Sequence, residues 1–422
     1  MHEGRGGGES DMRLLFISAA FPPMRAGESE HAYHQCLHLA SQGVEVHLLT
    51  SCANQGHPKM PFEVHPVMQD WSWKDLFRLA RFFRNNKPDA ILLMYSGWIY
   101  NSHPMITFAP TIAKHVLPGI PFVTQMEIEE GENWGSSMTR ALRKAAQFLV
   151  GPSGVDYSFG TLLRDSTRLI CLSEHHRTKH AARLPDVLKK SVVIPPPPLL
   201  TLCSDGPVAA RERGRTALGL RADEFLLVFF GYADKNKGIE TLFRAVQIAG
   251  KETDHIRLAM IGGGRGSATQ GVDQRAQSIS KYEWEILGLP DQLGISNKVT
   301  WLSGYDHDSD AASMYLYAAD ACVLPFDQGV TLSRSSLAAA VAHGIPVITT
   351  RGHSLETPFR HAENLFLCQP KDPEALALAI RRVMSTPDLR LQLAEGAGQL
   401  ARGWFSWEKA VTRLMETIQR DP

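Results

Sequence analysis

The side chains best suited to hold an anion gather in one loop, between an apolar run and a helix of small residues. The apolar run covers 321–325, the predicted helix covers 336–343, and Gly344 ends that helix. The loop and the first residue of the helix carry four hydroxyl groups and one guanidinium: Thr331, Ser333, Ser335, Ser336 and Arg334. Because the first N–H groups of a helix lack partners and lie at the positive end of its dipole, we expect a phosphate or diphosphate here. The same pattern also fits a plain strand–helix–strand unit that binds nothing.

The composition is that of a globular protein with more than one domain. The chain has 422 residues, which is long for a single hydrophobic core, so two domains are expected. Lys+Arg and Asp+Glu are equal at 44 each, and this balance gives no basic field for nucleic acid. No apolar run approaches the ~20 residues of a membrane span. We therefore expect a cytoplasmic protein.

The N-terminus and the cysteines agree with that compartment. Residues 1–11 lack the apolar centre of a signal peptide and are predicted to be a disordered leader. The six cysteines include no C-x-x-C pair and are expected to be reduced core thiols. Among the seventeen histidines, no pair has convincing metal-ligand spacing along the sequence.

Strands and helices alternate along the chain, which predicts parallel sheets covered on both faces. The first predicted domain is 12–198, and its end is marked by the four prolines of 195–198. A polar, Gly/Arg/Ala-rich linker is predicted over 199–215. The pattern then restarts in a second domain, 216–400. Ligands in such sheets lie beyond the carboxyl ends of the strands, which points to loops 21–28, 231–238, 262–265 and 304–305, and to the loop described first.

The order and spacing of these segments resemble the GT-B glycosyltransferases, in particular family 4 of the retaining, nucleotide-sugar-dependent enzymes (glycosyl transferases group 1). The family's opening strand, glycine loop and helix resemble FISAAFPPMRAGESEHAYHQCLHLASQGVEVHLLT. The start of its donor domain resembles FFGYADKNKGIETLFRAV, and later landmarks resemble AHGIPVITT and GWFSWEKAVTRLMETI. The resemblance runs over nearly the whole chain from Met12. It implies an α/β fold with two Rossmann-like βαβ domains facing a cleft and a C-terminal helix, 401–422, that packs back on the first domain.

The resemblance places a nucleotide-sugar donor on the second domain. Lys237 stands where the family's lysine reaches the donor diphosphate, although a solvated loop lysine is the alternative. The arginine that usually follows the motif glycine is Tyr232 here, so Arg334 or Arg265 is expected to supply that charge. The remaining donor-binding residues implied are Gly231, Gly263, Tyr305, Thr331, Leu332, Ser333 and Ser335. Such cations and helix-end amides stabilise a leaving diphosphate without a metal.

Acidic residues in this half bear on metal use and on contact with the donor sugar. Asp306, Asp308 and Asp310 have Asp-x-Asp spacing but match a polar connection better, so no catalytic metal is expected. Thr331 and Ala339 stand where the family has two glutamates. Asp327 is a candidate to contact the donor sugar instead, with a turn-forming role as the alternative. The missing glutamates also leave open a relative that has lost activity.

In the first domain the resemblance implies two further contacts. Gly27 takes the place of a family glycine whose backbone lies against the donor phosphate, and Glu28 and His31 follow it on the helix. Met126 stands near the position of the family's histidine at the sugar. Glu127, the next residue, is therefore carried as a candidate to orient the transferred sugar or the acceptor. A residue on a surface loop is the alternative.

The implied activity is transfer of a hexose, with retention of configuration, to a glycan or lipid-linked acceptor in surface polysaccharide biosynthesis. UDP-glucose is the first guess among UDP-sugars, and no cofactor beyond this co-substrate is expected. The aromatic and basic tract 71–84 allows peripheral membrane contact, although ordinary helix packing also explains it. Alternatives are a catalytically impaired sugar-nucleotide-binding relative and a sugar-nucleotide epimerase. A dinucleotide oxidoreductase is disfavoured because no G-x-G-x-x-G follows the first strand.

Overall fold

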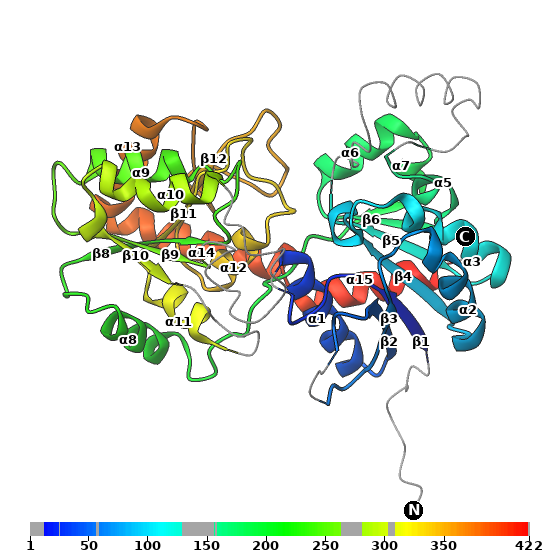
Figure 1. Cartoon of the computed structure of the whole chain (residues 1–422). Helices are drawn as coiled ribbons and strands as arrows, with labels where there is room; N and C mark the ends of the chain where they lie inside the picture. Colours follow the sequence, from blue (N-terminus) through cyan, green and yellow to red (C-terminus); the bar gives the residue numbers. More distant parts are fainter. Residues whose placement is uncertain are drawn as a thin grey trace, which may run out of the picture. The chain divides into compact units, whose positions relative to one another are not determined.

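The computed structural model describes residues 12–24, 26–55, 59–128, 156, 158–262, 281–302 and 309–420 (Figure 1). The chain divides into two compact units. Unit 1 is Met1–Pro195 with Trp407–Pro422, and unit 2 is Pro196–Ser406. The predicted leader, 1–11, lies outside the described residues. No helix of the described ranges is both long enough and apolar enough to cross a membrane.

Unit 1 is built on a seven-stranded parallel sheet in the order β3-β2-β1-β4-β5-β6-β7. Its strands are β1 (Arg13–Ile17), β2 (Glu45–Ser51), β3 (Glu63–Met68), β4 (Ala90–Tyr95), β5 (Phe122–Met126), β6 (Arg168–Cys171) and β7 (Ser191–Val193). Alternate residues of β1 enter different cores: Leu14 and Phe16 on one face, Leu15 and Ile17 on the other. The sheet is therefore buried on both faces, as a continuous apolar strand predicts.

Helices from both ends of the chain cover this sheet. They are α1 (Gly27–Ser41), α2 (Leu76–Asn86), α3 (Ala109–Val116), α5 (Leu162–Asp165), α6 (Glu174–Arg183), α7 (Val187–Lys190) and α15 (Trp407–Gln419). Val411, Leu414 and Ile418 of α15 belong to the same core as Leu14 and Phe16. The predicted return of the C-terminal helix to the first domain is thereby confirmed, with the helix starting at Trp407.

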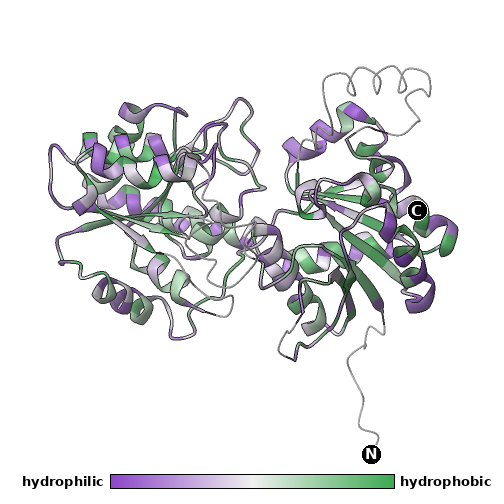
Figure 2. Ribbon diagram, in the orientation of Figure 1, coloured by the Kyte–Doolittle hydropathy of each residue, from purple (hydrophilic) through white to green (hydrophobic). Residues whose placement is uncertain are grey.

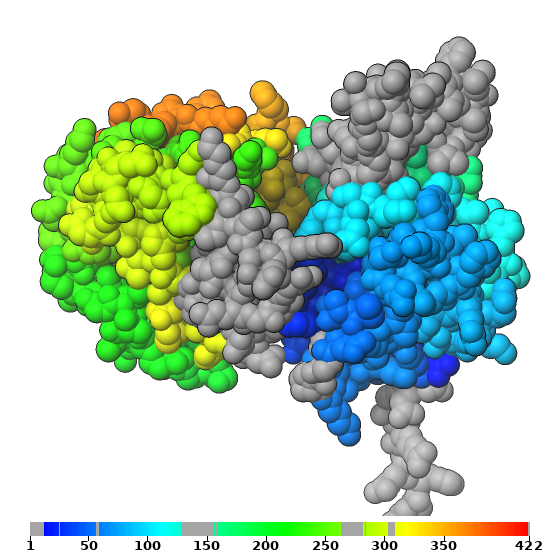
Figure 3. Space-filling view, viewed as in Figure 1, coloured from blue at the N-terminus to red at the C-terminus, as the bar shows by residue number. Residues whose placement is uncertain are grey.

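Unit 2 has a six-stranded parallel sheet in the order β10-β9-β8-β11-β12-β13. Its strands are β8 (Phe225–Phe230), β9 (Ile256–Ile261), β10 (Val299–Leu302), β11 (Ala321–Leu324), β12 (Val347–Thr350) and β13 (Phe366–Cys368). Its helices are α8 (Pro207–Ala217), α9 (Ile239–Ala249), α10 (Lys281–Gln292), α11 (Ala311–Ala318), α12 (Ser335–Ala342), α13 (Pro373–Ser385) and α14 (Pro387–Trp404). Apolar residues follow the strands of both sheets (Figure 2), and α10 and α11 lie on the surface of unit 2 (Figure 3).

In each unit the strand order reverses once, between β1 and β4 and between β8 and β11. This 3-2-1-4 order is the doubly wound Rossmann arrangement, and ligands bind at the reversal, beyond the carboxyl ends of the strands. The predicted α/β class with two Rossmann-like domains is confirmed.

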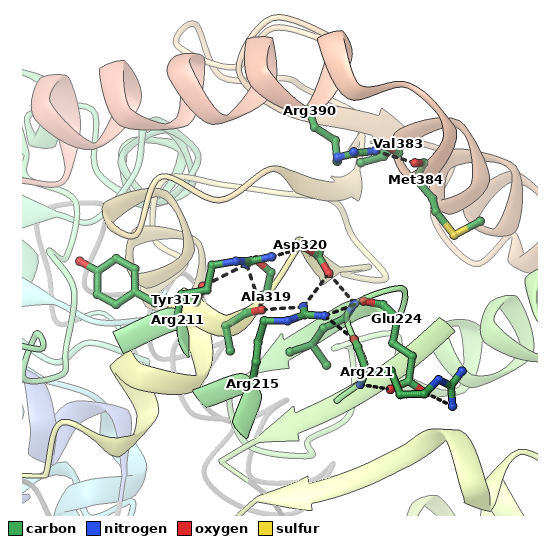
Figure 4. A network of polar contacts seen from close by, with 12 residues as sticks. Arg211, Arg215, Arg221, Glu224, Tyr317, Ala319, Asp320, Val383, Met384 and Arg390 are labelled. Atoms are coloured by element: carbon green, nitrogen blue, oxygen red, sulfur yellow. Dashed lines mark hydrogen bonds and ion pairs between the residues drawn. The ribbon is translucent and has the colours of Figure 1, made fainter. Parts of the chain in front are cut away.

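The stretch 199–215, which sequence composition favours as a linker, is instead largely part of unit 2. Residues 207–217 form α8, with Pro207 at its first turn. Arg211 of α8 donates hydrogen bonds to the carbonyls of 317, 318 and 319 at the end of α11, and its guanidinium pairs with Asp320 at 2.5 Å (Figure 4). Gly214 packs so closely that a Cβ there would lie 2.7 Å from the carbonyl oxygen of Met314. Arg211 therefore satisfies the carbonyl groups at the end of α11, a role that local composition does not reveal.

Candidate functional site

The reversal point of unit 2 brings the loop after β8 against the loop after β11. A Cβ at Gly238, which has φ +69°, would lie 1.8 Å from the carbonyl oxygen of Pro325. On the other side of the loop, a Cβ at Gly231 would lie 4.0 Å from the Cβ of Ser336 in α12. Glycine is therefore required at 238 both by its backbone conformation and by this close approach.

Two of the cations predicted to meet a diphosphate share one buried aromatic ring in this place. The Nζ atom of Lys237 lies 5.5 Å from the centre of the Phe326 ring, and the guanidinium carbon of Arg334 lies 4.8 Å from it. Phe326 is fully buried. Each cation gains a cation–π contact there, and an anion bound beside them would offset the repulsion between the two like charges.

Hydrogen bonds to Thr350 and Glu356 hold the loop before α12 in place. The N–H of Val330 donates to the carbonyl of Thr350 at 2.9 Å, and the N–H of Leu332 donates to the buried carboxylate of Glu356 at 2.5 Å. The hydroxyls of Thr331 and Ser333 are hydrogen-bonded to each other at 2.8 Å. Arg334 stands at the N-cap of α12, and its side chain has no acceptor for the first N–H groups of the helix. The N-terminus of α12 is thus suited to an anionic ligand.

The positions that replace the family's glutamate pair offer little to a sugar diol. Ala339 is fully buried inside α12, and the hydroxyl of Thr331 is engaged by Ser333. The N–H of Asp327 donates to the carbonyl of Asn236 at 3.1 Å. Asp327 also lines a pocket of about 490 Å³, together with Lys235 and residues of α9. Neither Lys237 nor Arg334 lines this pocket. Its role at the donor sugar stays a prediction. The predicted donor residues Gly263, Arg265 and Tyr305 lie outside the described residues.

The reversal point of unit 1 holds a partly buried carboxylate at the start of α1. Gly27 opens this helix, and the space around its α-carbon is open. The carboxylate of the next residue, Glu28, accepts hydrogen bonds from Ser96 Oγ at 3.0 Å and Trp98 Nε1 at 2.7 Å. Burial raises the pKa of Glu28 above its ordinary value, although the bonds from Trp98 and Ser96 act in the opposite sense.

A second carboxylate, Glu127, lies at the carboxyl end of β5. Its carboxylate is 3.1 Å from His31 Nδ1 of α1 and accepts a hydrogen bond from Gln125 Nε2 at 2.7 Å. The exposed fractions of the Glu127 and His31 side chains are 8% and 5%. The surface-loop alternative for Glu127 is therefore wrong. Met126, at the position of the family's histidine, is buried in the core and is not available to a ligand.

The structure also adds residues that the sequence does not single out. Ser96 and Trp98 follow β4 directly, and the polar turn after a buried strand beside β1 was an available signal for them. Phe326 is an ordinary apolar residue in the sequence. Glu356 lies 24 residues beyond Leu332, so no local pattern connects them. The fold brings several predicted residues to the reversal point of unit 2, between β8 and β11: Gly231, Lys237, Arg334 and the 331–335 loop. Near the reversal point of unit 1, between β1 and β4, lie Gly27 and Glu127.

Two Rossmann-like units with these strand orders are the architecture of the GT-B glycosyltransferases, and solved structures of this class match nearly the whole chain. Sucrose-phosphate synthase from Thermosynechococcus elongatus has 19% sequence identity and a TM-score of 0.67, covering 96% of this chain and 98% of its own. HepE of Anabaena, solved in complex with UDP and glucose, has 16% identity and a TM-score of 0.68. The match covers 96% of this chain and 99% of HepE. At these identities the comparison establishes the fold.

Sequence comparison finds similar proteins over about half of the chain. Residues 210–399 of this chain match the family described as Glycosyl transferases group 1. A D-inositol 3-phosphate glycosyltransferase of Corynebacterium urealyticum is 29% identical over 219 residues, 51% of this chain and 48% of the relative. Another such enzyme, from Catenulispora acidiphila, is 30% identical over 209 residues, which are 49% of this chain and 46% of the relative. The chain thus aligns with about half the length of these curated relatives.

Proposed function

We propose that this protein is a retaining, metal-independent glycosyltransferase that moves a hexose from a UDP-sugar to a hydroxyl-bearing acceptor. The observation that carries the proposal is the pairing of Lys237 and Arg334 on the Phe326 ring beside the N-terminus of α12. Fixed cations and helix-end amides are the groups that stabilise a leaving nucleoside diphosphate when no metal takes part. HepE of Anabaena, which has the same fold, was solved with UDP and glucose and also with UDP-glucose, which supports UDP-glucose as the first donor to test.

In this proposal the donor's diphosphate contacts Lys237, Arg334 and the first amides of α12, with the loop 331–335 around it. The glycosidic bond to the diphosphate breaks as the acceptor oxygen forms a bond to the anomeric carbon on the same face. The leaving phosphate oxygen takes the acceptor's proton, so the chemistry requires no protein base. The tightly held loop before α12 favours the reaction because its donors need little reorganisation as charge develops on the phosphate.

The acceptor is proposed to bind unit 1, where Glu28, His31 and Glu127 offer partly buried or buried polar groups near the reversal point. Carboxylates and an imidazole suit the hydroxyl groups of a sugar or polyol. A glycan or lipid-linked acceptor of surface polysaccharide synthesis is one candidate. The relatives named D-inositol 3-phosphate glycosyltransferases make inositol 3-phosphate a second acceptor to test.

The test is nucleotide release from a panel of UDP- and GDP-sugars, with and without inositol 3-phosphate and lipid-linked glycans. We expect UDP release from one UDP-sugar, dependent on an acceptor and lost in Lys237→Ala. Lys235→Ala removes the same charge two residues away and is the matched control, expected to keep activity. Release from GDP-sugars alone would contradict the proposed donor.

The same assay separates the alternative functions. A folded protein that binds a UDP-sugar without turnover, across the acceptor panel, would be the catalytically impaired relative that the missing glutamates suggest. Conversion of the sugar to its epimer without an acceptor would identify an epimerase. Either result would replace the proposed transfer reaction.

A further inference from the structure

Strands β2 and β3 lie side by side at one edge of the sheet in unit 1 (Figure 1). Two histidines and a glutamate meet on one face of this sheet, near the start of both strands. The parallel register pairs His47 with Glu63 and Leu49 with His65. Because alternate residues of a strand point to the same face, this register puts His47, Glu63 and His65 side by side. The two histidines are 18 positions apart in sequence, so sequence spacing alone does not reveal the pair.

The three side chains are spaced as ligands of one ion. The Nδ1 atom of His47 lies 3.1 Å from Nε2 of His65 and 3.2 Å from Oε2 of Glu63. The Nε2 atom of His65 lies 3.6 Å from Oε1 of Glu63. In a tetrahedral zinc site, with metal–ligand bonds of about 2.0–2.2 Å, neighbouring ligand atoms are roughly 3.3–3.5 Å apart. The distances observed here bracket that value.

Neighbouring groups orient His47 for this role. Its Nε2 atom donates to Oε1 of Glu45 at 2.9 Å, and the same oxygen accepts from Arg13 Nη2 at 2.7 Å. With the proton on Nε2, the lone pair of Nδ1 points into the cluster. A carboxylate behind a metal-binding histidine is the usual supporting arrangement in zinc sites. On the other histidine, the Phe82 ring of α2 packs edge-on at 5.1 Å and restricts its movement.

We propose that His47, Glu63 and His65 bind a divalent transition-metal ion, with Zn²⁺ as the expected ion. Two imidazoles and one carboxylate are a donor set that suits Zn²⁺ rather than Mg²⁺ or Ca²⁺, and they leave a fourth position for water. The cluster lies at the amino ends of the strands, whereas the candidate functional site lies at the carboxyl ends. The bound ion ties β3, the edge strand of the sheet, to β2.

A second cluster, in unit 2, contains a thiol and two carboxylates but is less suited to bind a metal ion. Cys203, Asp205 and Asp310 also lie close together. Arg213 is among them, with its guanidinium 2.9 Å from Asp205 and 3.5 Å from Asp310. That guanidinium already supplies the positive charge that a metal would bring. The ion pairs of Glu63, in contrast, are with His47 and His65 themselves.

The test is titration of the full chain, stripped by a chelator, with Zn²⁺ against a chromophoric competitor. We expect one Zn²⁺ per chain for the wild type. Loss of a supporting residue typically weakens a zinc site about 10- to 100-fold, which is the expectation for Glu45→Ala. Glu63→Gln and His65→Gln remove a ligand and should weaken binding more than that. His115→Gln removes an exposed histidine of the same unit and should bind as the wild type does.

A stability measurement gives the second readout. Zn²⁺ should raise the unfolding temperature of the wild type and of His115→Gln with increasing concentration, because an ion that binds only the folded state stabilises it. Glu63→Gln should show no such rise. The Glu63 side chain is 61% exposed, so this variant is expected to fold even if His65→Gln does not. Absence of stoichiometric binding in the wild type, or equal affinity in Glu63→Gln and His115→Gln, would overturn the proposal.

Discussion

At the scale of single residues, the candidate sites depend on charges and dipoles held by buried neighbours. The family resemblance singled out Lys237, and the position of Arg334 between a buried strand and a helix N-terminus singled out Arg334; their role in anion binding stays a prediction. Glu356 and Phe326, which position the same loop and the same cations, were not predictable. Their contacts join segments far apart in sequence, and their residue types are ordinary. Similarly, the burial of Glu127 depends on Gln125 and on His31 of another element.

His343 allows a prediction about pH at this scale. Its Nδ1 donates to the carbonyl of Ala339 at 2.7 Å, and its Nε2 accepts from Ser313 at 2.8 Å. Burial lowers the pKa of His343 from 6.5 to about 4. The neutral ring is favoured in the folded state, so its contribution is complete above pH 6.5 and is lost as pH falls towards about 4. A shift of this size corresponds to on the order of 3 kcal/mol.

We therefore expect the difference in unfolding free energy between the wild type and His343→Gln to shrink as pH falls through this window. Chemical denaturation at a series of pH values measures it. His353→Gln, at an exposed position of unit 2, is the control for removing an imidazole outside the core. A pH-independent difference for His343→Gln would show that the buried ring does not titrate as described.

At the scale of elements, alternating strands and helices predicted both sheets, because each apolar run is buried on two faces. The prediction of a linker over 199–215 was wrong for α8. An arginine-rich segment with glycine and alanine has the composition of a linker, but here Arg211 and Arg215 meet Asp320 and the end of α11. The loop after β8 shows the opposite case, because its segment of sequence resembles the corresponding loop of the family.

Gly238→Ala tests how tightly that loop is placed. A Cβ at 238 would clash with Pro325, whereas one at Gly219, which has φ +62°, would meet nothing within 4 Å. Gly219→Ala should therefore cost only the left-handed backbone strain, on the order of 1 kcal/mol. Gly238→Ala should cost clearly more and should also weaken UDP binding, because Lys237 moves with the loop. Denaturation and nucleotide titration of both variants provide the measurement, and equal effects would contradict the close packing of the two loops.

At the scale of the whole molecule, unit 1 is not one continuous stretch of the chain, because unit 2 is inserted between its two parts. Unit 1 contains residues from both ends of the chain, because α15 supplies Val411, Leu414 and Ile418 to its core. The family resemblance predicted this return, whereas hydrophobic periodicity alone does not say which sheet an amphipathic helix covers.

Leu414→Ala tests the contribution of α15 to unit 1. Leu414 is 1% exposed, so its truncation should destabilise unit 1 by about 2–5 kcal/mol. Leu391, on α14, is 71% exposed, and Leu391→Ala should change stability by no more than about 0.5 kcal/mol. Denaturation followed by tryptophan fluorescence would compare them. Equal, small effects would mean that α15 is not part of the core of unit 1.

The central claim is that Lys237 and Arg334, beside the N-terminus of α12, bind the diphosphate of a UDP-sugar. Calorimetric titration of UDP into the wild type, Lys237→Ala and Lys235→Ala at one fixed ionic strength tests it most directly. A charge-assisted hydrogen bond contributes about 1.5–3 kcal/mol, so Kd should rise roughly 10- to 100-fold in Lys237→Ala. Lys235→Ala should bind as the wild type does. Equal affinity in all three proteins, or no UDP binding by the wild type, would contradict the account.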